Sequence, residues 1–285
     1  MSRRGFQAVN AVVLGVVVIL TLFPFINVIA RSFSDEHAIQ TGGVTLWPRG
    51  FNTTTYRVVM NDPVFWQNYG NTVLYTVVAT AISMVLTTCY AYVLSKRRLR
   101  GRKVLIGIAV FTMFFNGGLI PNYVLVSALG LRNSLWAIVL PNAISVFNLL
   151  VMKAFFEHMP VELEEAGAVD GVSTYGALLR IVLPLSKAVI ATMTLFYAVS
   201  FWNSWFSAFL YLDDADMFPV TIYLRNLIAG ATAGSDISTP SDTAMQIAAN
   251  IQAVTIVLTA LPIILLYPFI QRFFVSGVTL GAVKG

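Results

Sequence analysis

Six stretches of the chain are apolar along their length and contain no Asp, Glu, Lys, Arg or His. An α-helix of about 20 such residues is long enough to cross the hydrocarbon core of a bilayer. The charged residues lie between the stretches and at the chain ends. The pattern predicts an all-α integral membrane protein with six transmembrane helices, at residues 9–30, 69–94, 104–126, 134–152, 188–210 and 249–271.

The composition supports this prediction. Of the 285 residues 57% are hydrophobic and only 11% are charged, and the mean hydropathy of +0.76 is too high for an ordinary soluble domain. The first apolar stretch follows Met-Ser-Arg-Arg, as a signal peptide would, but it continues through TLFPFINVIA without a small-residue cleavage site. We therefore expect a retained membrane anchor. The single cysteine, Cys89, excludes an internal disulfide framework.

The Lys and Arg residues predict the orientation. If the N-terminus is cytoplasmic, thirteen of the eighteen lie in inside segments, six of them within 95–103. This cluster, SKRRLRGRK, is interpreted as a topology anchor rather than a nucleic-acid patch, because no aromatic residue interleaves it. Both termini are then cytoplasmic, the longest inside loop is 153–187, and the long outer loops are 31–68 and 211–248.

The inside loop contains an unusually acidic segment, ELEEAGAVDG at 162–171, which holds four of the chain's thirteen acidic residues. Pro160 suits a first helical turn, and the three glutamates favour the positive end of a helix dipole. Gly167 and Gly171 permit tight packing and a turn, and Ser173 or Thr174 is suited to cap a second helix, which Pro184 closes. The pattern predicts helix, turn and helix, although a plain solvated loop is the alternative.

One motif in this loop resembles a known family. Glu165-Ala166-Gly167, three residues, Gly171, nine residues and Ile181-Val182-Leu183-Pro184 resemble the EAA signature of ABC importer permeases. Gly167 stands where the family usually has Ala, which should loosen the helix by up to about 1 kcal/mol without altering the surface. The resemblance implies a pair of coupling helices that docks on an ATPase subunit. The residues expected in this coupling surface are Glu162, Glu164, Glu165, Ala166, Gly167, Asp170, Gly171, Ile181, Leu183 and Pro184.

The resemblance extends over most of the chain. From about residue 5 onward it is similar to the maltose-type sugar permeases, and 114–160 and 277–285 resemble the subgroup for polysaccharide-derived oligosaccharides. The resemblance implies a type I ABC importer permease fold in a bacterial plasma membrane. It also implies four partners: a homologous second permease, two ATPases that carry ATP and Mg, and an extracytoplasmic sugar-binding protein. A homodimeric permease pair remains an alternative, and Lys284 in the tail is expected near the ATPase.

Other classes of protein fit less well. The chain has no G-x-x-x-x-G-K-[ST] phosphate loop, and the predicted spans hold no ionisable residue for proton coupling. His37 and His158 lie in an outer and an inner loop, without neighbours typical of metal ligands or of a catalytic set. We therefore expect no catalytic residue, metal or cofactor on this chain. An ATP-independent secondary transporter is the main alternative, and a membrane-embedded enzyme is a weaker one.

Uncharged polar and aromatic residues in the spans are candidates for a sugar path, because sugars bind through amide hydrogen bonds and aromatic faces. The candidates are Asn116, Asn142, Asn148, Trp202, Asn203 and Trp205. Each asparagine could instead tie helices together, and each tryptophan could anchor at the membrane interface. Gly117-Gly118 permits either close helix contact or a local break, and a break would favour a cavity. An oligosaccharide is the expected cargo; a monosaccharide, polyol or sugar phosphate is the alternative.

Overall fold

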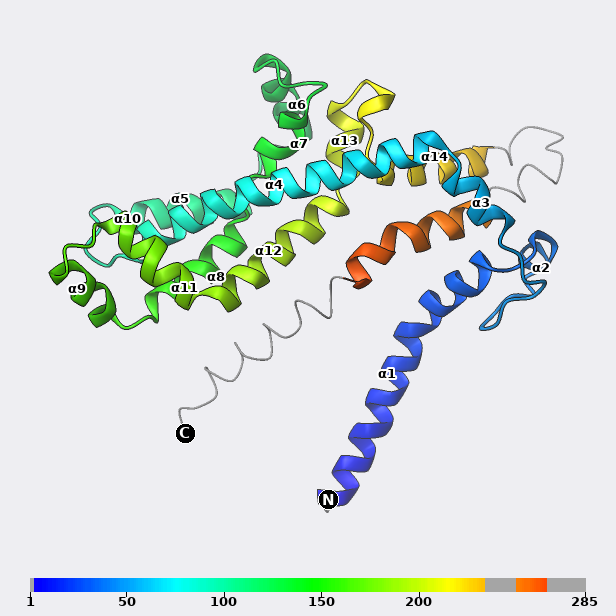
Figure 1. The fold of residues 1–285 in the computed structure, drawn as a ribbon, viewed down its shortest axis with the longest axis horizontal. Helices are drawn as coiled ribbons and strands as arrows, with labels where there is room; N and C mark the ends of the chain where they lie inside the picture. The colour runs from blue at the N-terminus through cyan, green and yellow to red at the C-terminus, as the bar shows by residue number, and fades with distance from the viewer. Residues whose placement is uncertain (1–2, 234–249, 266–285) are drawn as a thin grey trace. The chain divides into compact units, whose positions relative to one another are not determined.

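The computed structural model describes residues 3–233 and 250–265, and within these ranges the chain is helical, without strands. The chain divides into two compact units. The first comprises the described parts of Met1–Asn68 and Val220–Pro262, and the second those of Tyr69–Pro219 and Ile263–Gly285. Each unit is described by itself (Figure 1).

The first unit is built around a long apolar helix. Helix α1 (Arg3–Ser32) includes 28 residues of high hydropathy, and its most apolar window is entirely unburied within the described chain. An apolar helix left so bare requires lipid or another chain around it. The other helices of this unit are α2 (Glu36–Gln40), α3 (Thr54–Met60), the first turns of α4 (Pro63–Ser95), α14 (Val220–Ala233) and a helix at Asn250–Leu265.

The segment 31–68, predicted as an outer loop, contains α2 and α3 and is held by side-chain contacts. The Tyr56 hydroxyl lies 2.9 Å from Ser32 Oγ, and the Phe33 ring stacks on the ring of Tyr56 at 4.9 Å. The Tyr223 hydroxyl of α14 donates to the Asp62 carboxylate at 2.8 Å. Burial, followed by this hydrogen bond, raises the pKa of Tyr223. These contacts give the loop fixed side-chain partners and not only polar composition.

The second unit consists of most of α4 and a series of shorter helices. They are α5 (Arg102–Phe114), α6 (Leu119–Ala128), α7 (Leu135–Val139), η1 (Leu140–Asn142), α8 (Val146–Glu157), α9 (Val161–Val169), α10 (Thr174–Ala177), η2 (Leu178–Val182), α11 (Leu183–Leu185), α12 (Lys187–Trp202), α13 (Phe206–Tyr211) and η3 (Ala215–Met217). Figure 1 shows α9 and α10 grouped at the end of the unit where α4 finishes. The η2 segment is a single π-helical stretch.

Two of the predicted spans, 104–126 and 134–152, coincide with helix pairs that bend sharply, and a third sharp bend directly precedes the predicted span 188–210. The axis turns by 114° between α5 and α6, by 52° between Leu135–Asn142 and α8, and by 86° between Thr174–Leu185 and α12. The first bend lies at the Gly117-Gly118 pair, where Gly118 adopts a left-handed φ of 91°. Of the two possibilities for this pair, the structure therefore has the local break.

The number of membrane crossings stays a prediction. Among the described residues, two helices are continuous and apolar enough to cross a bilayer, and there are up to five candidates if each bent pair is one span. The apolar helix Asn250–Leu265 covers the described part of the sixth predicted span, whose last residues, 266–271, lie outside the described residues. The tail residues 277–285, with Lys284, also lie outside them.

A buried core holds the charge-rich end of the second unit together. Its members come from α4, α5, α8, η2 and α12, and they are Ala91, Tyr92, Leu94, Ala109, Leu149, Met152, Phe156, Leu178, Val182, Val189 and Met193. Leu178 and Val182 belong to the segment that follows the acidic motif. That segment is therefore packed into the helical body, because its apolar side chains share one core with α4 and α8.

Candidate functional site

The acidic segment forms two short helices joined by a glycine turn. Pro160 directly precedes α9, and α9 ends at Val169, followed by Asp170 and by Gly171 with a left-handed φ of 78°. The Val172 amide donates to the Gly167 carbonyl at 2.8 Å and closes the helix end. Ser173 then caps α10, its hydroxyl accepting from the Gly176 amide at 3.2 Å. The predicted helix–turn–helix is confirmed, with Ser173 as the cap.

Gly167 is the position where α9 packs against the segment that follows it. The residue is buried, and a Cβ built on it would lie 2.7 Å from Ile181 Cδ1. Such a contact requires the tip of Ile181 to move. An alanine here would therefore change the packing between α9 and η2, and helix propensity is only part of the effect of this glycine.

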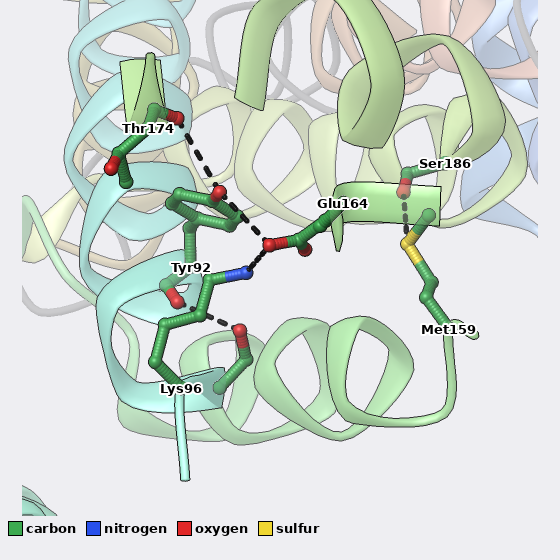
Figure 2. A network of polar contacts seen from close by, with 7 residues as sticks. Tyr92, Lys96, Met159, Glu164, Thr174 and Ser186 are labelled. Atoms are coloured by element: carbon green, nitrogen blue, oxygen red, sulfur yellow. Dashed lines mark hydrogen bonds and ion pairs between the residues drawn. The ribbon is translucent and has the colours of Figure 1, made fainter. Parts of the chain in front are cut away.

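The other residues of the motif differ in their solvent exposure. Glu162, Glu165 and Asp170 are exposed, as are Ala166, Gly171 and Pro184, whereas Ile181 and Leu183 are half-buried. Glu164 is half-buried because its carboxylate pairs with the ammonium group of Lys96 (Figure 2). Three carboxylates of the segment thus face outward, and one is held within the chain.

The same segment exposes apolar side chains beside its carboxylates. Val169 is 88% exposed and Tyr175 is 82% exposed, on either side of the Gly171 turn. Val161 and Leu179 are also largely exposed. Apolar side chains so exposed on a charge-rich segment are typical of a protein-binding surface.

Two cavities border the bends of the helices. The larger, of about 600 Å³, is bounded by α6, η1 and α13 near the first break. Its polar lining residues are Asn116, Asn122, Asn142, Ser207 and Tyr211, and the rest of the lining is mainly Leu, Val, Pro and Phe. Asn116 Oδ1 accepts from the Gly118 amide at 3.0 Å and from Asn122 Nδ2 at 3.2 Å, so it also holds the break in place.

The smaller cavity, of about 320 Å³, lies at the second bend. It is lined by Asn142, Ser145, Asn148, Tyr197 and Ser200, among others. The Tyr197 hydroxyl accepts from the Ser145 amide at 2.9 Å and lies 2.6 Å from Thr87 Oγ1. One buried tyrosine of α12 therefore contacts both the bend before α8 and the C-terminal third of α4.

The linings of both cavities contain amide, hydroxyl and apolar groups and no carboxylate, amine, guanidinium or imidazole. In the part of the chain that the structure describes, no group of three His, Cys, Asp or Glu residues could hold a metal ion. Uncharged amides and hydroxyls beside apolar surface can bind a sugar by hydrogen bonds and by contact with its ring faces.

The predicted path residues divide into two groups. Asn116, Asn142 and Asn148 line one or both of these cavities. Trp202, Asn203 and Trp205 line neither. The Trp202 ring is buried edge-on against the Tyr69 ring at 5.7 Å, the Asn203 amide returns to the Val199 carbonyl at 2.9 Å, and the Trp205 ring contacts the ring of Phe206 at 5.5 Å.

Several lining residues were not among the predicted ones. They are Asn122, Ser145, Tyr197, Ser200, Ser207 and Tyr211. All except Tyr211 lie inside predicted spans, and Tyr211 directly follows one. An uncharged polar side chain in a span was the signal that selected Asn116, and the same signal applies to Asn122, Ser145, Ser200 and Ser207.

The chain is similar over its whole length to known transport proteins. It is 41% identical over 288 residues to protein LplC of Bacillus subtilis, covering 100% of this chain and 96% of LplC. It is 39% identical to the polygalacturonan/rhamnogalacturonan transport system permease protein YtcP of the same organism, with both chains fully covered. No family model matches the chain.

A solved structure gives the same result. A chain in the crystal structure of a bacterial ABC transporter involved in the import of the acidic polysaccharide alginate superimposes with a TM-score of 0.86 and 34% sequence identity. The match covers 96% of this chain and 99% of that one. With its helical bends, its acidic helix pair and these full-length similarities, the chain belongs to the family of sugar ABC importer permeases.

Proposed function

We propose that this chain is one permease subunit of an importer that moves an oligosaccharide into the cytoplasm by alternating access. Separate ATPase subunits hydrolyse ATP, and the chain itself supplies the path and the coupling surface. The observation that carries the proposal is the ordered α9–α10 pair, which presents exposed carboxylates and apolar side chains together at one end of the helical body. The distribution of Lys and Arg supports a cytoplasmic position for both termini and for this pair.

The proposed coupling surface is the exposed face of this pair. Glu165 and Asp170 provide negative charge, and Val169 and Tyr175 provide apolar area that water would otherwise cover. Leu178 and Val182 anchor the pair in the buried core beside α4 and α8. A displacement imposed by the ATPase would therefore reach the membrane helices through packed side chains, which shift between discrete arrangements rather than deforming.

The proposed cargo is an oligosaccharide derived from a polysaccharide, and a uronate-containing one is favoured. YtcP is named for polygalacturonan and rhamnogalacturonan, and the similar solved transporter imports alginate. Asn116, Asn122 and Asn142 offer amides for sugar hydroxyls. The linings of these two cavities at the helical bends offer no cation. Cations for uronate carboxylates would therefore come from the second permease, which we expect to be homologous but different.

Two other functions are kept as alternatives. A monosaccharide, polyol or sugar phosphate would use the same amides, and comparing uptake of uronate oligomers, neutral oligomers and a sugar phosphate distinguishes these cargoes. An ATP-independent secondary transporter would move cargo without the ATPases. The predicted partners, namely a second permease, two ATPases and an extracytoplasmic binding protein, make the two mechanisms separable by reconstitution.

The test uses the full complex in liposomes with its binding protein, measuring sugar uptake and ATP hydrolysis. Gly171→Trp combined with Glu165→Lys alters the coupling surface, and Gly130→Trp is the matched control, because Gly130 also has a left-handed φ and open space around it. We expect uptake and substrate-stimulated hydrolysis to collapse only in the first variant while the complex stays assembled. Uptake that continues without ATP would overturn the proposal.

A further inference from the structure

The end of α4 contacts both helices of the acidic pair. Lys96, which follows the last residue of α4, pairs with the Glu164 carboxylate of α9. The Tyr92 hydroxyl lies 3.4 Å from Glu164 Oε2 and 3.4 Å from the Thr174 carbonyl at the start of α10. Figure 2 shows Tyr92 between Glu164 and Thr174, with Lys96 on the same carboxylate.

These three side chains support one another. The Lys96 ammonium lies 3.9 Å from the centroid of the Tyr92 ring, a cation–π contact. Tyr92 is only 4% exposed, and the exposed side-chain fractions of Lys96 and Glu164 are 33% and 28%. Partial burial and a shared partner distinguish this cluster from a fully exposed ion pair, whose partners are screened by water and salt.

Glu164 differs in this respect from the other carboxylates of its segment. Glu162 and Glu165 are exposed, whereas Glu164 is directed at Lys96 and Tyr92. A carboxylate already bonded to an ammonium and close to a hydroxyl has little capacity left for a partner protein. Its position therefore fits a role inside the chain better than a role in the docking surface.

The packing around the cluster links the same elements. Tyr92 shares the buried core with Leu178 and Val182, which follow α10. Arg102 donates from Nε to the Leu94 carbonyl at 2.6 Å and pairs with Glu157 of α8, so the end of α4 is also fixed to its neighbours. A movement of α9 and α10 that left α4 in place would have to break the Lys96–Glu164 ion pair and both contacts of the Tyr92 hydroxyl.

We infer that Tyr92, Lys96 and Glu164 form a clasp that makes the acidic helix pair and the end of α4 move as one body during transport. Glu164 is in this view a positioning residue that acts through α4, and not a contact with the ATPase. The inference rests on the proposed function, since it specifies how the coupling surface drives the membrane helices. The clasp is the side-chain link between the element that receives the ATPase movement and the longest helix of the second unit.

The test is a charge-swap cycle in the reconstituted complex, with sugar transported per ATP hydrolysed as the readout. Lys96→Glu and Glu164→Lys each place like charges together, and we expect each to lower this ratio by about threefold or more. The double variant restores an opposite-charge pair, and its ratio should return to within about twofold of wild type. Arg100→Glu is the matched control, because Arg100 is exposed in the same loop and its change alters the local charge equally.

The outcomes separate the possibilities. A contact of Glu164 with the ATPase would leave the double variant as impaired as Glu164→Lys, and that result would overturn the clasp. So would single variants whose ratio matches that of Arg100→Glu. A wild-type complex that transports without ATP would instead contradict the proposed function and not the clasp.

A milder variant keeps the test valid if complexes with the charge-reversal variants assemble poorly. Tyr92→Phe keeps the ring beneath Lys96 and removes only the hydroxyl that reaches Glu164 and Thr174. We expect normal assembly with a ratio lowered by about twofold. An unchanged ratio in Tyr92→Phe, together with an unrescued double variant, would leave no role for the cluster in coupling.

Discussion

The hydroxyl of Tyr197 accepts a hydrogen bond from the Ser145 amide at the bend before α8, so Tyr197→Phe tests what stabilises this bend. Ser145 is the N-cap of α8. At the start of a helix, an amide has no carbonyl of a preceding turn to bond to. The Tyr197 hydroxyl accepts from the Ser145 amide and lies 2.6 Å from Thr87 Oγ1, within hydrogen-bond distance. Replacing Tyr197 by Phe therefore leaves the Ser145 amide without this acceptor while the ring still fills its place.

The magnitude follows from these two bonds. An unsatisfied buried donor costs about 1–3 kcal/mol. Tyr197 borders the cavity of about 320 Å³, so water can replace part of the loss, and we expect about 1–2 kcal/mol. Thr87→Val should cost only about 0.5–1 kcal/mol, because Tyr197 then still accepts from Ser145. The double variant should cost about as much as Tyr197→Phe alone, because the two changes remove a shared bond.

The assay compares thermal unfolding midpoints of the purified complex and follows hydrogen exchange in the peptide that contains Ser145. Tyr197→Phe should lower the midpoint more than Thr87→Val and should speed exchange at the bend. Thr87→Val should leave exchange there nearly unchanged. Equal destabilisation by the two single variants, or additive effects in the double variant, would refute the reasoning.

Three further predictions concern other parts of the chain. Gly167→Ala should change stability by less than about 1 kcal/mol, because the gain in helix propensity offsets the contact with Ile181; adding Ile181→Val should improve the thermal midpoint of the alanine variant. Ser173→Ala removes the cap of α10 and should cost about 1 kcal/mol, with faster hydrogen exchange at Gly176. Asn142→Leu removes an amide that borders both cavities and should raise the KM for uptake several-fold, whereas Asn203→Leu should not.

Local features of the site could be predicted from the sequence because their chemistry is local. Ser173 caps α10, Gly171 makes the turn, and Gly117-Gly118 marks the break, each within a few residues of the group that it serves. Pro141 and Pro184 similarly indicate the other two bends, since each proline lies close to the point where the helix axis turns.

The remaining features depend on contacts between distant residues. Lys96 and Glu164 are 68 positions apart, and no pattern in either segment pairs one basic residue of the cluster with one of three glutamates. The sequence also does not show which face of a helix lines a cavity: Trp202 is predicted on the path, and its ring packs on Tyr69. Composition is enough to predict spans, whereas the partners of side chains across helices required the fold.

The continuity of α4 has a consequence for biosynthesis in the membrane. With 33 residues it is about 50 Å long, enough to cross a bilayer by itself, whereas α5 and α6 are about 20 Å and 15 Å long. A break such as that between α5 and α6 interrupts the helical hydrogen bonds, and bare lipid cannot replace them. We therefore expect α4 to insert from the translocon into the bilayer as a complete helix. The bent segments should reach their final positions only when they pack against α4.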